Sequence, residues 1–120
     1  MYGFPPAQPF TPTRWLNEGD TVTLGEHQLE VRHCPGHTPG HQSLLVKLPK
    51  TGAVLLSGDA VHFKSNWQNM GVPAGNTDKE KTVSSMKRLQ ELLTQNKAEL
   101  WINHDKPQRE SLKLAPASYE

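Results

Sequence analysis

The sequence predicts an α/β fold of β-hairpins, one long helix and a short final strand. Apolar and polar residues alternate over residues 21–33, an apolar run covers 53–56, and a helical stripe of apolar residues runs from Val83 to Leu93. Alternation is typical of half-buried strands, whereas recurrence every three or four residues is typical of an amphipathic helix. Strands therefore fill the first half of the chain, and the helix follows them.

The first two elements in order are an extended arm and a hairpin. We expect residues 1–18 to form the arm, because proline disrupts both helices and strand ladders and this segment holds Pro5, Pro6, Pro9 and Pro12. Residues 21–24 and 28–33 then alternate across the turn at Gly25-Glu26. This pattern predicts a β-hairpin.

A second pair of strands is predicted at residues 43–48 and 53–57, joined by the turn Pro49-Lys50-Thr51-Gly52. The continuous apolar stretch Val54-Leu55-Leu56 indicates a strand that is buried on both faces. Residues 60–76 contain Gly71, Pro73 and Gly75 and are predicted to be one long loop. Loops of that length in small domains are often functional.

The long helix is predicted to start at a capping box, Thr77 followed by Glu80, and to end near Asn96. Its apolar stripe is assigned to core packing and to no chemistry. Residues 99–102 are predicted to form the short final strand, and the tail from Pro107 is expected to be polar and to lie on the surface.

Candidate functional residues follow three of these strands. The loop Pro35-Gly36-His37-Thr38-Pro39-Gly40-His41 holds imidazoles between two Pro-Gly pairs, which favour a tight turn that aims a side chain. Asp59 follows the apolar run, and His104 follows the last strand. Imidazole and carboxylate suit Zn²⁺. The alternative is a solvated turn that contains two histidines.

This ordered set of motifs resembles the C-terminal half of a metallo-β-lactamase-fold hydrolase. Residues 4–41 are similar to glyoxalase II-like thioesterases, whereas residues from 42 onward are more similar to N-acyl homoserine lactonases. The chain is then either a composite of the two or one natural relative with intermediate features. The resemblance implies half of an αββα fold over residues 19–120, preceded by the arm.

The resemblance also implies the site. His37, Asp59 and His104 correspond to metal ligands, with Asp59 bridging two Zn²⁺ ions in the complete family site. Asp59 and His62 are the expected catalytic residues: a metal-bound hydroxide attacks the carbonyl of a lactone or ester, and His62 assists at the carbonyl or leaving group as a general acid. His41 is expected to support the ligands, and Cys34 to be a small buried hydrophobe.

The chain departs from the family in one respect. The signature H-x-H-x-D-H is absent from the sequence, so we expect about one Zn²⁺ in this chain and leave open whether the chain is an enzyme by itself. A lactonase is the preferred function. The alternatives are a glyoxalase II-like thioesterase and a non-catalytic fragment that binds metal weakly or self-associates. Half of the fold would expose a sheet face, so a homodimer or the missing N-terminal half is the expected partner.

Composition limits the classes of partner and the cellular compartment that we expect. Thirteen basic and twelve acidic residues give a net charge of +1, which argues against nucleic acid as a partner and leaves a small-molecule ester, lactone or thioester. One cysteine excludes an internal disulfide and fits a reducing compartment. No stretch resembles a signal peptide or a membrane span, so a cytoplasmic location is expected.

Overall fold

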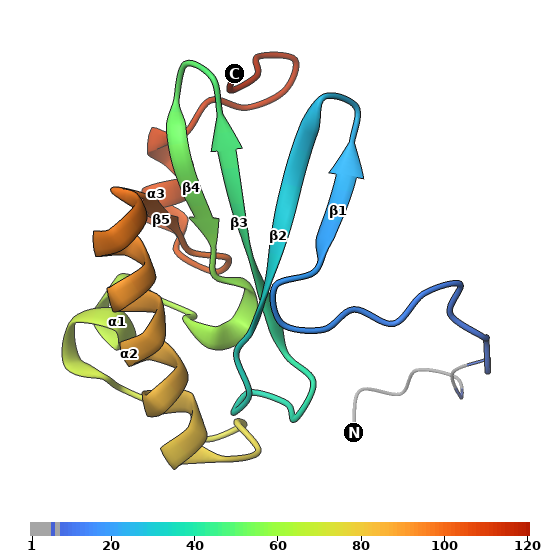
Figure 1. Ribbon diagram of the computed structural model, residues 1–120. Helices are drawn as coiled ribbons and strands as arrows, with labels where there is room; N and C mark the ends of the chain where they lie inside the picture. Colours follow the sequence, from blue (N-terminus) through green and yellow to red (C-terminus); the bar gives the residue numbers. More distant parts are fainter. Residues whose placement is uncertain (1–5, 7) are drawn as a thin grey trace.

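The computed structural model describes residue 6 and residues 8–120, and within them the chain builds one five-stranded sheet (Figure 1). Neighbouring strands follow the chain order, with β1 to β4 antiparallel and β5 parallel to β4. The strands are β1 (Thr21–Leu24), β2 (His27–His33), β3 (Gln42–Leu48), β4 (Gly52–Leu56) and β5 (Glu99–Trp101). The two predicted hairpins and the final strand are confirmed.

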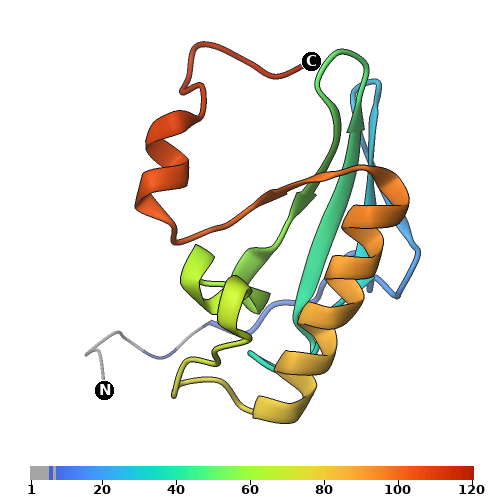
Figure 2. The same ribbon diagram turned by 90° about the vertical axis from the view of Figure 1, so that its left-hand side faces the viewer.

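Helix α2 (Lys79–Asn96) covers one face of the sheet (Figure 2). Its Leu89 packs with Leu45 and Leu55 in a fully buried cluster that also includes Cys34. The helical stripe is therefore core, as the sequence predicts. Burial raises the pKa of the Cys34 thiol, so this side chain behaves as a small hydrophobe rather than a nucleophile.

The opposite face of the sheet is also apolar. Because side chains alternate along a strand, the paired positions Leu44–Leu56 and Val46–Val54 point away from α2. Val54 is buried and Leu56 is only half-buried, so burial on both faces holds for Val54 and Leu55 but not for Leu56.

The C-terminal segment lies over that second face (Figure 2). The Tyr119 ring meets the Trp101 ring edge-on, with centroids 4.7 Å apart, and the amide of Lys50 in the β3–β4 turn donates to the Glu120 carbonyl. A hollow of about 420 Å³ remains between the sheet and this segment, lined in part by Leu44, Leu56 and Trp101.

The tail from Pro107 is mostly exposed, as expected, but the sequence analysis did not predict the helix α3 (Lys106–Ser111) that forms there. The Asp105 carboxylate accepts from the Gln108 amide and caps the helix, and Pro107 lies in the first turn, where its missing N–H costs nothing. Gln108 in turn bonds Leu100 and Ile102 and holds the final strand in place.

The predicted loop at 60–76 is also partly wrong. A 3₁₀ turn, η1 (Gly58–Ala60), precedes α1 (Lys64–Asn69), and residues 61–63 and those beyond α1 are irregular. The Asp105 carboxylate accepts from the Lys64 amide, so a side chain distant in the sequence satisfies one of the backbone N–H groups at the start of α1. The helix ends at Met70, which adopts the left-handed conformation with φ of 50°.

Helix α2 begins two residues after Thr77. Asp78, not Thr77, is the N-cap, and its carboxylate accepts from the Lys81 amide at 2.9 Å. The capping-box prediction therefore locates the helix but names the wrong capping residue. The Thr77 hydroxyl instead donates to the carbonyl of His37, in the loop of residues 35–41, which we call the histidine loop.

Residue 6 and residues 8–18 form neither helix nor strand. The other residues of the predicted arm, 1–5 and 7, lie outside the described part of the chain. At the end of the arm the Glu18 carboxylate accepts from the His33 amide and from Arg88, which ties the arm to β2 and α2. Among the described residues no helix is long and apolar enough to cross a membrane.

Candidate metal centre

The backbone of the histidine loop is fastened to the start of α2. The carbonyl of Gly36 accepts from the Asp78 amide at 2.9 Å, and the carbonyl of His37 accepts from the Thr77 hydroxyl at 2.8 Å. About two turns further on, the Ser85 hydroxyl donates to the Pro35 carbonyl. The loop is therefore held at three successive residues.

Gly36 permits this close approach. Its φ is +139°, and a Cβ atom there would lie 2.3 Å from the Thr82 hydroxyl oxygen and 2.4 Å from the Thr82 amide nitrogen. Only a residue without a side chain fits between the loop and the helix.

A chain of hydrogen bonds fixes the ring of His37. The Thr82 hydroxyl donates to the Asp78 carbonyl, so it accepts from the Asn76 amide group at 3.1 Å. Asn76 then presents its oxygen to His37 Nδ1 at 3.1 Å. The proton of a neutral His37 therefore sits on Nδ1. The other ring nitrogen, Nε2, keeps its lone pair, faces Asp59 and is available to bind a metal.

Asp59 is positioned by the turn that follows β4. Its amide donates to His41 Nε2 at 2.8 Å, and Gly58, with φ of 52°, makes room because a Cβ there would lie 2.8 Å from that ring nitrogen. Burial lowers the pKa of His41, which keeps the ring neutral and able to accept. His41 thus supports the site, as the sequence predicts.

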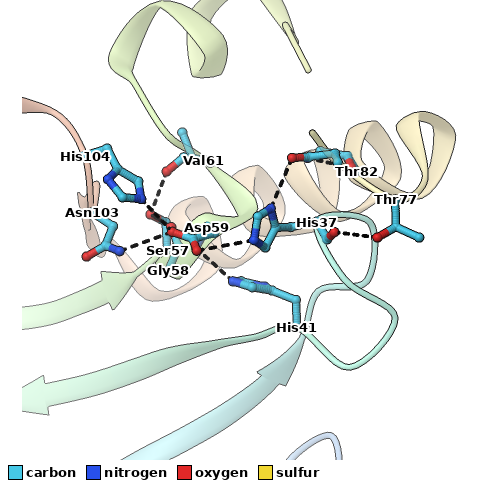
Figure 3. A network of polar contacts seen from close by, with 11 residues as sticks. His37, His41, Ser57, Gly58, Asp59, Val61, Thr77, Thr82, Asn103 and His104 are labelled. Atoms are coloured by element: carbon cyan, nitrogen blue, oxygen red, sulfur yellow. Dashed lines mark hydrogen bonds and ion pairs between the residues drawn. The ribbon is translucent and has the colours of Figure 1, made fainter. Parts of the chain in front are cut away.

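Two imidazoles approach separate oxygens of the Asp59 carboxylate (Figure 3). His37 Nε2 lies 3.4 Å from Oδ2, whereas His104 Nε2 lies 2.9 Å from Oδ1. Burial pushes the pKa of Asp59 upward, but hydrogen bonds from Asn103 and His104 outweigh it and lower the pKa overall. Asp59 is therefore an ionised carboxylate with a histidine nitrogen beside each of its two oxygens.

His62 joins the group on the His104 side. The two rings are nearly parallel, with centroids 5.1 Å apart and an interplanar angle of 12°, and the centroid of the His37 ring lies 5.4 Å from that of His62. Burial lowers the pKa of His62, so the neutral imidazole that a metal requires is favoured. Its Nδ1 is buried and has no hydrogen-bond partner among the described residues.

The four predicted site residues thus lie together at one end of the sheet, whereas His27 and His33 lie along β2. Three imidazoles and one carboxylate suit Zn²⁺, and the unpartnered His62 nitrogen is an atom that an ion could satisfy. The sequence-based reasoning missed Asn76, Asn103 and Thr82. Asn103 directly precedes a predicted ligand and Asn76 lies in a segment that resembles the lactonases, which are usable signals, whereas Thr82 carried none.

Comparison with known proteins identifies the family. The model of the metallo-beta-lactamase superfamily matches residues 2–98. The chain belongs to this superfamily. Within it, the chain is 43% identical over 99 residues to an N-acyl homoserine lactonase of a Bacillus species. The aligned region covers 82% of this chain and 38% of that protein. It is 36% identical over 96 residues to the N-acyl homoserine lactonase AttM of Azorhizobium caulinodans, covering 80% of this chain and 36% of that one.

Comparison with solved structures shows the same fold. An N-acyl homoserine lactone hydrolase with the product N-hexanoyl-L-homoserine bound at its catalytic metal centre superimposes with a TM-score of 0.72 at 38% identity, covering 87% of this chain and 40% of that one. The quorum-quenching lactonase AidC, a dizinc enzyme, shares the fold with a TM-score of 0.61 at 22% identity. The predicted partial metallo-β-lactamase fold is confirmed, and the superfamily implies a metal. The chain spans about two fifths of the length of these relatives.

Proposed function

We propose that this chain forms the C-terminal part of the active site of a metal-dependent hydrolase that opens the ring of N-acyl homoserine lactones. The observation that carries the proposal is the Asp59 carboxylate, which has a histidine nitrogen at each of its two oxygens. It is supported by 43% identity to an N-acyl homoserine lactonase over most of the chain.

In this proposal His37, Asp59 and His104 hold the metal, which is zinc. A metal in such a site supplies a nucleophilic water at neutral pH and polarises the substrate carbonyl. Asp59 contributes one oxygen to each side of the site, and His37 offers Nε2 because Asn76 occupies its Nδ1 proton. Neighbouring His62 is the proposed general acid for the alcohol that leaves when the lactone C–O bond breaks.

The site that this chain provides has few donors for two ions. On the side of Asp59 Oδ2, His37 supplies the histidine nitrogen. The sequence contains no H-x-H-x-D-H segment that would add further ligands. We therefore expect slow lactone hydrolysis by the chain alone, because a second ion lacks enough ligands.

Complementation tests this function. The 120-residue chain is coexpressed with a segment of a lactonase relative that carries H-x-H-x-D-H, and ring opening is followed by the proton that the new carboxylic acid releases at neutral pH. Zinc-dependent hydrolysis of N-hexanoyl homoserine lactone that disappears in Asp59→Asn supports the proposal. Faster hydrolysis of an acyl thioester would assign the thioesterase alternative, and no turnover of either substrate would assign the non-catalytic one.

The proposed partners are a small-molecule lactone and a protein surface that covers the apolar face of the sheet. Leu44 and Leu56 on that face are only half-buried, which favours either a second copy of the chain or the N-terminal half of the fold. Sedimentation of the chain with and without the complementing segment distinguishes a homodimer from a heterodimer. The lone, buried Cys34 supports the cytoplasm as the proposed compartment.

A further inference from the structure

We propose that His62 is a metal ligand and that Asp59, His62 and His104 together hold the first ion, with His37 outside its shell. This inference rests on the proposed function only in that Asp59 belongs to a metal centre. It revises the ligand set of the proposed function, in which His37, Asp59 and His104 hold the metal, and it replaces the general-acid role of His62 with a direct bond to the ion.

The positions of the donor atoms carry the inference. Among the described residues, Asp59, His62 and His104 are the three histidine, cysteine or acidic side chains that each offer a ligand atom within 4.8 Å of the others. Donors bound to one Zn²⁺ at about 2.0–2.2 Å are necessarily less than about 4.4 Å apart. Small side-chain rotations therefore bring all three onto one ion.

The two sides of Asp59 are unequal in this respect. On the Oδ1 side, His104 Nε2 is already at 2.9 Å and the His62 ring stacks on the His104 ring. On the Oδ2 side, His37 Nε2 is farther away, at 3.4 Å, and its ring is held from behind by Asn76. Three donors meet on the first side, whereas two meet on the second.

The surroundings of His62 favour a ligand. Its Nδ1 is buried without a hydrogen-bond partner in the described part of the chain, and a buried polar atom of this kind usually has a partner that is protein, water or an ion. The stacked His104 ring and the fixed start of α1 limit the positions the imidazole can take. A bond to zinc satisfies a ring nitrogen without moving the backbone.

The first test compares zinc affinity in matched variants of the 120-residue chain, stripped of metal and titrated with Zn²⁺ against a coloured chelator. His62→Asn is expected to weaken binding at least about 100-fold, since even the loss of a group that merely supports a ligand costs about 10–100-fold. His37→Asn is expected to stay within about threefold of the parent, and His27→Asn, on the remote hairpin, is the control for nonspecific binding.

A second measurement does not depend on a variant that folds. The ring ¹⁵N resonances of the parent chain are followed by NMR as Zn²⁺ is added. One equivalent is expected to shift a nitrogen of both His62 and His104, and His37 is expected to shift only when zinc is in excess.

Three results would overturn the inference: unchanged affinity in His62→Asn, equal losses in His62→Asn and His37→Asn, or a His62 ring that does not respond to zinc. Each returns His62 to the role of general acid. Since no substrate is used, these results are independent of the complementation assay: a chain that binds zinc through His62 but supports no hydrolysis refutes the function and leaves the ligand assignment standing.

Discussion

Replacing Gly36 with alanine is expected to destabilise the chain strongly, because the loop that carries His37 has no room for a methyl group. The new Cβ would lie 2.4 Å from the Thr82 amide nitrogen and 2.5 Å from the Thr82 Cα. Both are backbone atoms of α2, so no flexible side chain can move away to relieve the clash.

The size of the effect follows from two terms. A φ of +139° is strained for any residue with a side chain and costs about 1–3 kcal/mol. Overpacking against a fixed backbone costs about 1–3 kcal/mol more. We therefore expect Gly36→Ala to lower the free energy of unfolding by about 4 kcal/mol, a large part of the about 5–15 kcal/mol that stabilises an ordinary domain.

Gly40→Ala in the same loop is the matched control. A Cβ at Gly40 meets no atom within 4 Å, and its φ is not in the left-handed range. Its free energy of unfolding is expected to stay within about 1 kcal/mol of the parent. Urea unfolding measures both variants, and native-state hydrogen exchange shows whether the amides of Thr77 and Asp78, which donate to the loop, lose protection in Gly36→Ala. Equal unfolding midpoints for the two variants would refute the packing argument.

Three further predictions concern the core, the arm and the helix caps. Leu89→Ala removes a side chain that is 0% exposed and is expected to cost about 2–5 kcal/mol in urea unfolding, whereas Leu24→Ala, 68% exposed, should cost less than about 0.5 kcal/mol. Burial raises the pKa of Glu18, but bonds from the His33 amide and two arginines lower it overall. The ionised Glu18 therefore stabilises the fold fully above its unfolded-state pKa of about 4.3, and this stabilisation is lost as the pH falls through the lower folded-state pKa. The free energies of unfolding of the parent and of Glu18→Gln should thus converge on acidification, and a difference that persists would contradict this. Asp105→Ala removes the carboxylate that caps both α1 and α3 and is expected to cost about 2 kcal/mol, with Asp105→Asn losing less; thermal unfolding compares them.

Local patterns made the strands and the long helix predictable. Alternation sets which strand face is buried, and the turn residues fix where each strand ends, so the positions of His37, Asp59 and His104 at strand ends followed from sequence. Their convergence was expected from the family resemblance alone, because the order of the strands in the sheet was not predicted. The pairing of β4 with β5 is what brings Asp59 and His104 to the same edge.

The contacts that orient the site were not predictable in the same way. Asn76 bonds His37, a residue 39 positions earlier, and Asp105 caps α1 from 41 positions away. Such contacts depend on how α2 and the final strand pack against the sheet, and neither sequence pattern nor propensity encodes that register. Helix α1 has no side-chain cap from its own N-cap residue, so it lacked a local signal. Helix α3 had one, Asp105 two residues before Pro107, and could have been found.

Protein contacts position the ligand atoms of the candidate centre, and this affects how the chain should bind metal. His37 is fixed by Asn76, Asp59 by His41, and His104 by its bond to the Asp59 carboxylate. Because folding already organises the donors, the affinity of each side of Asp59 should depend mainly on how many donors it offers. The Oδ1 side has two imidazoles nearby, so we expect it to fill first. The Oδ2 side offers one, so it is the side on which additional ligands from another segment would have the largest effect on affinity and on catalysis.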